Sequence, residues 1–493
     1  MIQKFRERLI LILIILLPFH AFGVTVFTKI IRGNNHAPLP LIAFWKEAII
    51  LVVLSIIFLE LLFSFRKIKL EGSSHLASLK SITNLDILDK LIITFFALAF
   101  LVTLFSESSL RAFVFGAKYD LFPLLIFLML RRVAWSSSFF PRVLKSIVAV
   151  GLIVAIYGIV SFFFPMGFFR FLGFSDLHSV YSPNSSLAAF QQIESMGLRR
   201  IQSTFSGPNQ FGLWLLLPWS AGVFGLTKVW MDRESFFVRL FSPSRTHNTI
   251  LVFSIFFVLT TGTALLLTFS RSAWLAAFIL LIFIIIFQYD GERERRILVR
   301  SSGLFIITFV ALALLFPAVV LRADSTKDHI LKPLKGVQSI INNPFGLGLG
   351  AAGPASNRVS DACVFLEKGA NTSWAVDRPE LCVFAGDIQM QPLGRVCSCP
   401  FVVENWYLQI GVELGIIGLI LFLSIIITLL IKLKRQKGTG VFMVFCAFLG
   451  VCLAGMLLHS FEDAAVAYTV WILAGVGLGA KKKEVTVADL LME

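Results

Sequence analysis

Long apolar runs separated by short polar segments dominate this 493-residue chain. Runs of about 17–25 apolar residues are long enough to cross roughly 30 Å of bilayer hydrocarbon as helices. Because such runs recur along most of the chain, we expect an all-α polytopic membrane protein. The runs predict about twelve transmembrane helices, at about 9–31, 41–65, 87–106, 110–130, 143–165, 207–227, 249–269, 272–289, 302–321, 403–431, 440–459 and 464–480.

These helices divide the chain into groups separated by two longer polar segments. The larger polar segment is predicted to be an extracytoplasmic loop between the ninth and tenth helices. The predicted parts are helices one to five (1–165), an extracytoplasmic loop (166–206), helices six to nine (207–321), the large loop (322–402), helices ten to twelve (403–480) and a cytoplasmic tail (481–493).

Composition and charge agree with a membrane protein. Hydrophobic residues make up 57% of the chain, above the roughly 45–50% of soluble domains. The net charge of +15 would suggest nucleic acid in a soluble protein, but here Lys and Arg gather in the loops of one side, which the positive-inside rule makes cytoplasmic. We therefore expect a bilayer and not a nucleic acid as partner, in the cytoplasmic membrane, with an uncleaved first helix and both termini inside.

Four cysteines, Cys363, Cys382, Cys397 and Cys399, lie in the large loop. They indicate either two disulfides or a zinc site. Zinc ligands usually come in closely spaced pairs, and only Cys397 and Cys399 approach this spacing. The predicted topology puts the loop outside, where disulfides form. The sequence leaves all three possible pairings open.

Two arginines fall on the face expected to be poor in basic residues. Arg271 lies in the tight turn between helices seven and eight, and Arg200 precedes the helix-start signal Gly207-Pro208-Asn209. Arg271 is either a residue that reaches the lipid headgroups or a functional group. Thr204, Ser206 and Asn209 either cap helix six or belong with Arg200 to an anion site at the helix N-terminus. Two guanidinium groups on one face favour a diphosphate clamp.

Glu404 lies where the large loop re-enters the membrane. It is either a carboxylate placed favourably near a helix N-terminus or a general base, its pKa raised by desolvation and lowered by nearby arginine. The polar segment His459-Ser460-Phe461-Glu462-Asp463 forms the outer turn between the last two helices, either as a rim element or as part of the site, whereas His329 has no evident partner.

Three further patterns need an interpretation. Gly346, Gly348 and Gly350 are predicted to form a flexible turn and not a nucleotide loop, because strand and helix do not flank them. Lys46-Glu47 and Lys118-Asp120 are predicted either to pair locally or to line a polar cavity. The pattern contains no metal-ligand constellation on the outer side, so we expect neither a metal nor another cofactor.

Several motifs together resemble the O-antigen ligase/polymerase superfamily. Thr268–Trp274 is similar to its Thr-x-Ser-Arg-Gly-Ala-Trp element, and Arg200–Asn209 to its Arg…Thr-Phe-x-x-Pro-Asn element. Asn405–Gln409 with Glu413–Leu419 resembles its His-Asn-x-Tyr-Leu-Gln…Glu-x-Gly-Ile-x-Gly element, preceded by the turn at Asn343–Gly348. The resemblance covers roughly residues 195–480.

The resemblance implies a metal-independent, inverting glycosyltransferase. Such an enzyme moves a glycan from an undecaprenyl-diphosphate carrier to an acceptor hydroxyl, on a glycan or glycolipid, at the outer face of the membrane. Arg200 and Arg271 would hold the diphosphate, and Glu404 stands where the family has a histidine that assists the acceptor. Either Glu404 replaces this histidine as base, or His459 or His329 supplies an imidazole from elsewhere, or this chain has a different acceptor or reduced activity. Substrate binding is assigned to Arg199, Asn209, Asn405, Tyr407, Gln409, Glu413 and His459.

Two other functions are compatible with the pattern. A lipid or polysaccharide transporter would need charges along helices through both leaflets, and no pair of matching broken helices is evident. A non-catalytic scaffold for envelope assembly is suggested by the missing family histidine.

Overall fold

The computed structural model describes residues 2–71, 85–106, 108–175, 186–193, 197–231, 247–288, 323–436 and 438–479, with isolated positions between 296 and 317. The predicted ninth helix at 302–321 lies almost entirely outside the described residues, and the tail at 481–493 lies wholly outside them. In the described parts the chain is mostly helical, with few strands.

The described residues form mostly helices and a few short strands. The helical elements are α1 (Ile2–Leu16), η1 (Leu17–Phe19), α2 (His20–Arg32), α3 (Pro40–Ala43), α4 (Trp45–Glu71), α6 (Ile87–Phe105), α7 (Leu110–Gly116), η3 (Ala117–Leu121), α8 (Phe122–Leu130), α9 (Phe139–Ser161), α10 (Met166–Phe171), α11 (Pro208–Met231), α13 (His247–Leu267), α14 (Arg271–Gln288), α17 (Ala323–Asn342), α18 (Gly353–Val359), η6 (Ser373–Asp377), α19 (Trp406–Arg435), α20 (Thr439–Ala454) and α21 (Ala464–Leu478). The strands are β1 (Gln191–Ile193), β2 (Leu198–Arg200), β3 (Ala362–Leu366), β4 (Leu381–Ala385) and β5 (Ile388–Gln391).

Seven helical segments among the described residues are long and apolar enough to cross a bilayer: Ile2–Arg32, Ile87–Phe105, Leu110–Leu130, Phe139–Ser161, Pro208–Val229, Asn248–Leu267 and Trp406–Arg435. Three shorter apolar helices accompany them, at Arg271–Phe287, Thr439–Ala454 and Ala464–Leu478. The expectation of an α-helical membrane protein is thus supported in its coarse form. The number of twelve spans stays a prediction.

Helix α11 is at the centre of the bundle. It packs on α9, α13, α14 and α20, and its first turns bury Phe211 and Trp214 beside Phe205. Small residues permit the close approach of the neighbouring helices, because a Cβ on Gly151 of α9 would lie 2.5 Å from the Pro218 side chain. The core therefore fixes the N-terminal end of α11, where Arg200 and Asn209 lie.

Some predicted helices are continuous only in hydropathy. The predicted helix at 110–130 consists of α7, a π-helical turn η3, and α8, a type of irregularity often found at functional positions. Within α19, Gly415 has φ +70°, and a Cβ there would lie 2.2 Å from the Pro344 carbonyl oxygen. Only glycine fits this break, which lets the turn before α18 pack against α19.

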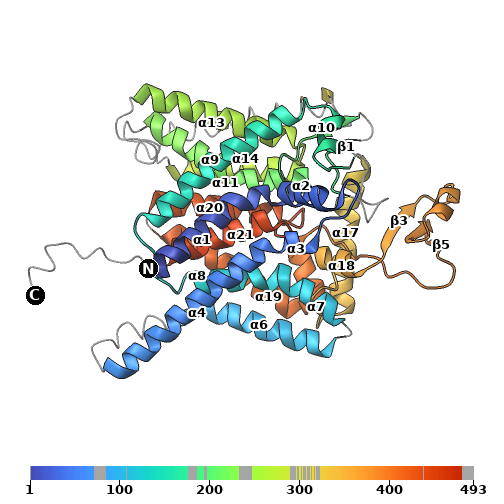
Figure 1. Cartoon of the computed structure of the whole chain (residues 1–493), viewed down its shortest axis with the longest axis horizontal. Helices are drawn as coiled ribbons and strands as arrows, with labels where there is room; N and C mark the ends of the chain where they lie inside the picture. Colours follow the sequence, from blue (N-terminus) through green and yellow to red (C-terminus); the bar gives the residue numbers. More distant parts are fainter. Residues whose placement is uncertain are drawn as a thin grey trace, which may run out of the picture.

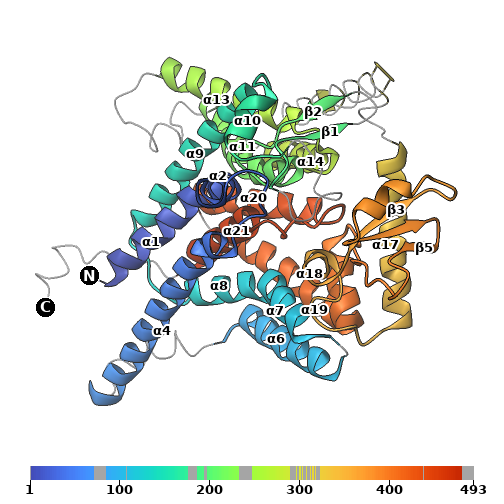
Figure 2. The same ribbon diagram turned by 45° about the vertical axis from the view of Figure 1, so that its right-hand side comes forward.

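The large loop is structured. In Figure 1 the long helices run side by side across the view, and α17 stands across their right-hand end, with β3 and β5 extending beyond it. Figure 2 shows the same arrangement from another side. Helix α17 packs on α19, and Ile330, Leu334, Val337 and Ile341 form an exposed apolar stripe on it.

Two disulfides stabilise the strand module of this loop. Strands β3 and β4 pair in parallel, with Cys363 opposite Cys382, and β5 pairs antiparallel to β4. The bonds Cys363–Cys399 and Cys382–Cys397 tie both strands to the segment that returns to the bundle. The disulfide prediction is confirmed, and the nested pairing is the one of three that the structure selects.

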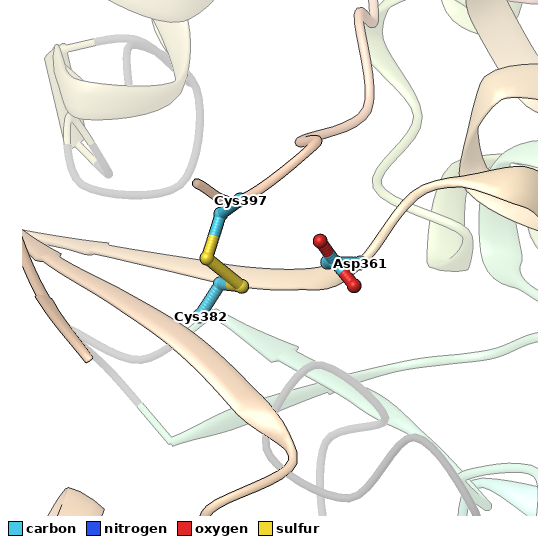
Figure 3. Close-up of side chains that lie close together, drawn as sticks. All are labelled: Asp361, Cys382 and Cys397. Atoms are coloured by element: carbon cyan, nitrogen blue, oxygen red, sulfur yellow. A yellow bond between two sulfur atoms is a disulfide. The ribbon is translucent and has the colours of Figure 1, made fainter. Parts of the chain in front are cut away.

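Asp361 lies beside the Cys382–Cys397 bond (Figure 3). These three residues have ligand atoms within 4.8 Å of one another, but both sulfur atoms belong to a disulfide and are not thiolates. Asp361 instead accepts two hydrogen bonds from Arg395, at 2.7 and 3.0 Å. The ion pair lowers the pKa of Asp361, with a further contribution from the Ser398 N–H. The zinc alternative does not fit these contacts.

Candidate functional site

Arg200 lies against the turn that carries Arg271. Its Nε donates to the Thr268 carbonyl oxygen at 3.0 Å, and its terminal nitrogens donate to Gln191 Oε1 at 3.1 Å and to Asn209 Oδ1 at 2.7 Å. The next residue, Ile201, donates its N–H to the Leu267 carbonyl at 3.1 Å. Two segments about 70 residues apart therefore meet at one point of the structure.

Several hydrogen bonds stabilise the turn itself. Phe269 has φ +49°, a left-handed conformation that is unusual for a bulky residue. Ser270 N–H donates to Thr268 Oγ1 at 3.2 Å, and Trp274 Nε1 donates back to the Leu265 carbonyl at 2.9 Å. Helix α14 begins at Arg271, which is half-buried.

Gly212 brings α11 against this turn. A Cβ at Gly212 would lie 3.0 Å from Ala273 Cβ and 3.2 Å from Thr268 Oγ1. The first turn of α11, which begins at Pro208, thus lies beside the first turn of α14. Two helix N-termini, each the positive end of a helix dipole, lie close to Arg200.

The three side chains that the sequence offered as caps of this helix bond elsewhere. Thr204 Oγ1 donates to the Pro18 carbonyl at 2.7 Å, and Ser206 Oγ donates to Asp463 Oδ2 at 3.0 Å. Asn209 accepts from Arg200. The neighbouring Arg199 faces away, as expected for adjacent strand residues: it donates to the Phe164 carbonyl at 3.0 Å and lies 4.9 Å from the Phe190 ring centroid.

Glu404 is held by Lys332 and His329, two side chains of α17. Its carboxylate lies 2.5 Å from Lys332 Nζ and 2.7 Å from His329 Nδ1. Burial alone would raise the pKa of Glu404, but the hydrogen bonds and charges of His329 and Lys332 outweigh it and lower the pKa to about 2. Among the described residues, Glu404 pairs with Lys332 and not with an arginine, and the expectation that His329 has no partner is wrong. A carboxylate with so low a pKa is a weak base.

Residues of the following helix make contacts within the bundle. Asn405 caps α19 by accepting the Leu408 N–H at 3.0 Å, and it donates to the Met456 carbonyl at 2.8 Å. Tyr407 donates to the Cys452 carbonyl at 2.8 Å. Gln409 is fully buried, with its amide 3.5 Å from Asp120 Oδ1. Substrate binding by Asn405, Tyr407 and Gln409 stays a prediction.

Glu413 organises the glycine turn before α18. It is fully buried, and its Oε1 accepts the N–H groups of Gly350 and Ala352 at 3.1 and 3.2 Å. Gly346 and Gly350 have φ of +91° and +83° and lie so close to neighbouring backbone that a Cβ would clash. The expected flexible turn is therefore a packed one, whereas the predicted role of Glu413 in substrate binding is untested.

A cavity of about 250 Å³ lies next to the start of α11. Its wall includes Ser206 and Gln210 of this region, the cations Lys46, Lys118 and Arg358, and the outer turn with Glu462 and Asp463. Lys46 and Lys118 both pair with Glu47, at 3.2 and 3.0 Å. The predicted local pair of Lys46 with Glu47 is confirmed, but Lys118 pairs with Glu47 and not with Asp120.

The ionisable groups of the outer turn have shifted pKa values. Burial lowers the pKa of His459 to about 4, with Glu404 opposing and Lys332 adding to the effect. Burial raises the pKa of Glu462 to about 7, a second rise comes from Asp463, and Arg358 counteracts both. The His459 ring lies edge-on to Trp406, with centroids 6.4 Å apart.

The sequence placed Glu462 and Asp463 in a polar turn that is either a rim element or part of the site, and only the structure shows them as components of a cavity wall. They were visible only as part of a polar turn, because their partners come from helices hundreds of residues earlier. The pairing of His329 with Glu404 was missed. The spacing of His329 and Lys332 places them on one face of a helix, but the sequence predicted a loop for this segment. No family model matches this chain, and no curated protein matches it.

Proposed function

We propose that this protein is a membrane-embedded glycosyltransferase of the O-antigen ligase/polymerase type, which uses a polyprenyl-diphosphate-linked glycan as donor. The observation that carries the proposal is the meeting of Arg200 with the Thr268–Arg271 turn. Sequence resemblance named two arginines, and the contact of Arg200 with the turn that carries Arg271 is a separate argument for a shared ligand.

The chemistry of the point where they meet suits a diphosphate. Arg271 begins α14, and Arg200 bonds to Asn209 in the first turn of α11. Guanidinium groups bind phosphate oxygens in a forked geometry, and the two helix N-termini add N–H donors and dipoles of the right sign. When the acceptor oxygen attacks the anomeric carbon, negative charge grows on the departing diphosphate. Groups fixed in advance around that charge lower the barrier.

Within this proposal Glu404 contributes by position. Its pairing with Lys332 and His329 holds α17 against the start of α19, and its low pKa makes proton abstraction unfavourable. We therefore assign to Glu404 the ordering of the outer helix next to the site and seek the proton acceptor elsewhere.

The test is reconstitution of the purified protein in vesicles with a polyprenyl-diphosphate-linked glycan and a saccharide acceptor. We expect transfer by the wild type and a loss of at least about 100-fold in Arg271→Ala and Arg200→Ala, as for removal of one preorganised donor. Arg111→Ala is the matched control, because Arg111 is an exposed arginine of α7 outside the proposed site. Full transfer by either site variant would contradict the diphosphate clamp.

A transporter is the second candidate, and one observation favours it. Lys46 and Glu47 are almost fully buried and pair next to the cavity, and buried ionisable groups within membrane helices commonly mark a transport path. The same vesicles separate the two functions. Movement of intact lipid-linked glycan across the bilayer without transfer to the acceptor would favour the transporter, and neither activity would favour a scaffold.

A further inference from the structure

The cavity beside α11 has the composition of a binding site for a polar ligand. Three cationic side chains and two carboxylates contribute to its wall, together with the aromatic rings of Tyr119, Phe461 and Tyr468. Charged groups that orient hydroxyls, combined with aromatic faces, suit a sugar ring. A volume of about 250 Å³ is slightly below the lower end of the roughly 300–1,000 Å³ typical of small-molecule pockets, which suits a single sugar unit.

The two carboxylates of the cavity differ in how they are held. Asp463 is fixed, because it accepts Ser206 Oγ at 3.0 Å and caps α21 through the Ala465 N–H at 2.8 Å. In the part of the chain that the structure describes, the Glu462 carboxylate has no hydrogen-bond partner, although its residue lines the cavity. Asp463 is therefore a structural anchor, and Glu462 is available to a ligand.

The cavity adjoins the proposed diphosphate site. Gln210 contributes to the cavity wall, and a Cβ on Gly207 would lie 2.6 Å from Gln210 Oε1 and 3.4 Å from Gln191 Nε2. Gln191 in turn accepts a hydrogen bond from Arg200 at 3.1 Å. Gln210 and Gln191 thus lie between the cavity and Arg200.

We propose that the cavity is the acceptor subsite and that Glu462 takes the proton from the attacking hydroxyl of an acceptor saccharide. The inference rests on the proposed glycosyl transfer and deepens it. The acceptor O–H bond breaks and its proton goes to the Glu462 carboxylate. The acceptor oxygen forms the new bond to the anomeric carbon. The bond from this carbon to the diphosphate oxygen breaks, and the polyprenyl diphosphate leaves with the electron pair. Glu462 then loses the proton to water.

The other candidates in this region suit the role less well. A general base is most effective when its pKa is near the working pH. The pKa of Glu404 is about 2 and that of His459 about 4, whereas that of Glu462 is about 7. Glu404 is moreover occupied by Lys332 and His329.

Several ionisable groups surround Glu462 and enter its pH dependence. They come from five elements packed around the cavity: His20 of α2, Lys46 of α4, Lys118 and Tyr119 of η3, Arg358 of α18, and Asp463 and Tyr468 at the start of α21. Arg358 lowers the pKa of Glu462. The transfer rate should rise with pH as Glu462 loses its proton, and Arg358→Gln should therefore move this rise to higher pH while leaving donor binding unchanged.

The decisive experiment compares Glu462→Gln with wild type, Glu462→Asp, and the control Glu367→Gln, an exposed acid of the disulfide module. Vesicles contain lipid-linked glycan and a free saccharide acceptor, and both transfer rate and donor binding are measured. We expect Glu462→Gln to lose roughly 10²–10⁴-fold in kcat with donor affinity within about twofold of wild type. Glu462→Asp should retain part of the activity and a pH-dependent limb, and the Gln variant should have none.

The outcomes separate the two levels of inference. Wild-type transfer by Glu462→Gln, with Arg271→Ala inactive, would overturn the role of Glu462 and leave the glycosyltransferase intact. An equal loss of donor binding and transfer in Glu462→Gln would assign it a structural role and also overturn the inference. Absence of transfer by the wild type would remove the proposed function and this inference with it.

Discussion

The ion pairs of Glu404 make a prediction that can be worked out in magnitude. We consider Glu404→Gln, which keeps the size of the side chain and removes its charge. Lowering the carboxyl pKa from its ordinary 4.5 to about 2 corresponds to roughly 3 kcal/mol at neutral pH, because one pKa unit is about 1.4 kcal/mol. Lys332 and His329 are about one-third exposed, at 35% and 30%, and regain water when the charge is lost. We therefore expect Glu404→Gln to lower the stability of the contact between α17 and the segment before α19 by about 1–3 kcal/mol.

This loss should be local to the contact between α17 and the segment before α19. We expect amide hydrogen exchange in α17 around residues 329–340 to become faster by about 5- to 150-fold at pH 7 in Glu404→Gln, since local opening has its own free energy. Packing of Val403 against Gly336, which remains in the variant, preserves the docked structure. Glu367→Gln, at an exposed acid without ion pairs among the described residues, is the control and should leave protection unchanged.

The sign of the pH dependence follows from the lowered pKa. Stabilisation by Glu404 is fully present above pH 4.5 and is lost as the pH falls through about 2. Protection factors of α17, corrected for the intrinsic exchange rate, should fall over this interval in the wild type and should not do so in Glu404→Gln. Equal protection of the two proteins at pH 7, or protection in the wild type that does not change on acidification, would refute the reasoning.

Two further predictions concern the packing around the site. Glu413→Ala should lower the stability of the detergent-solubilised protein by about 2–6 kcal/mol, because it leaves the buried N–H groups of Gly350 and Ala352 without an acceptor. Glu413→Gln is the control, because it keeps the acceptor oxygen. Equal melting temperatures of the Ala variant and the wild type would contradict this role. Gly212→Val should lower the free energy of unfolding by about 1–3 kcal/mol through overpacking and reduce glycan transfer, because the new side chain would press on Ala273 and Thr268. Unchanged transfer and melting temperature would show that the turn with Arg271 does not depend on this contact.

Local patterns in the sequence were sufficient for the membrane character of the fold and for part of the site. Hydropathy gives the helices because each must match the thickness of hydrocarbon by itself. Arg271 in a two-helix turn and Arg200 before a helix start were predicted to lie on one face, and the structure brings Arg200 into contact with that turn. The four cysteines could be assigned to disulfides from the predicted side of the membrane, but not to a pairing.

Tertiary packing decided everything that depends on residues distant in the chain. Lys118 has Asp120 two residues away, yet η3 directs it to Glu47, since a helical turn does not bring side chains two positions apart together. Glu404 could have been a free base by sequence, but α17 brings Lys332 and His329 onto it. Glu462 lines a cavity only because α2, α4, η3, α11 and α18 surround the last turn. The pKa of a carboxylate follows from its burial and neighbouring charges, and no local pattern contains either.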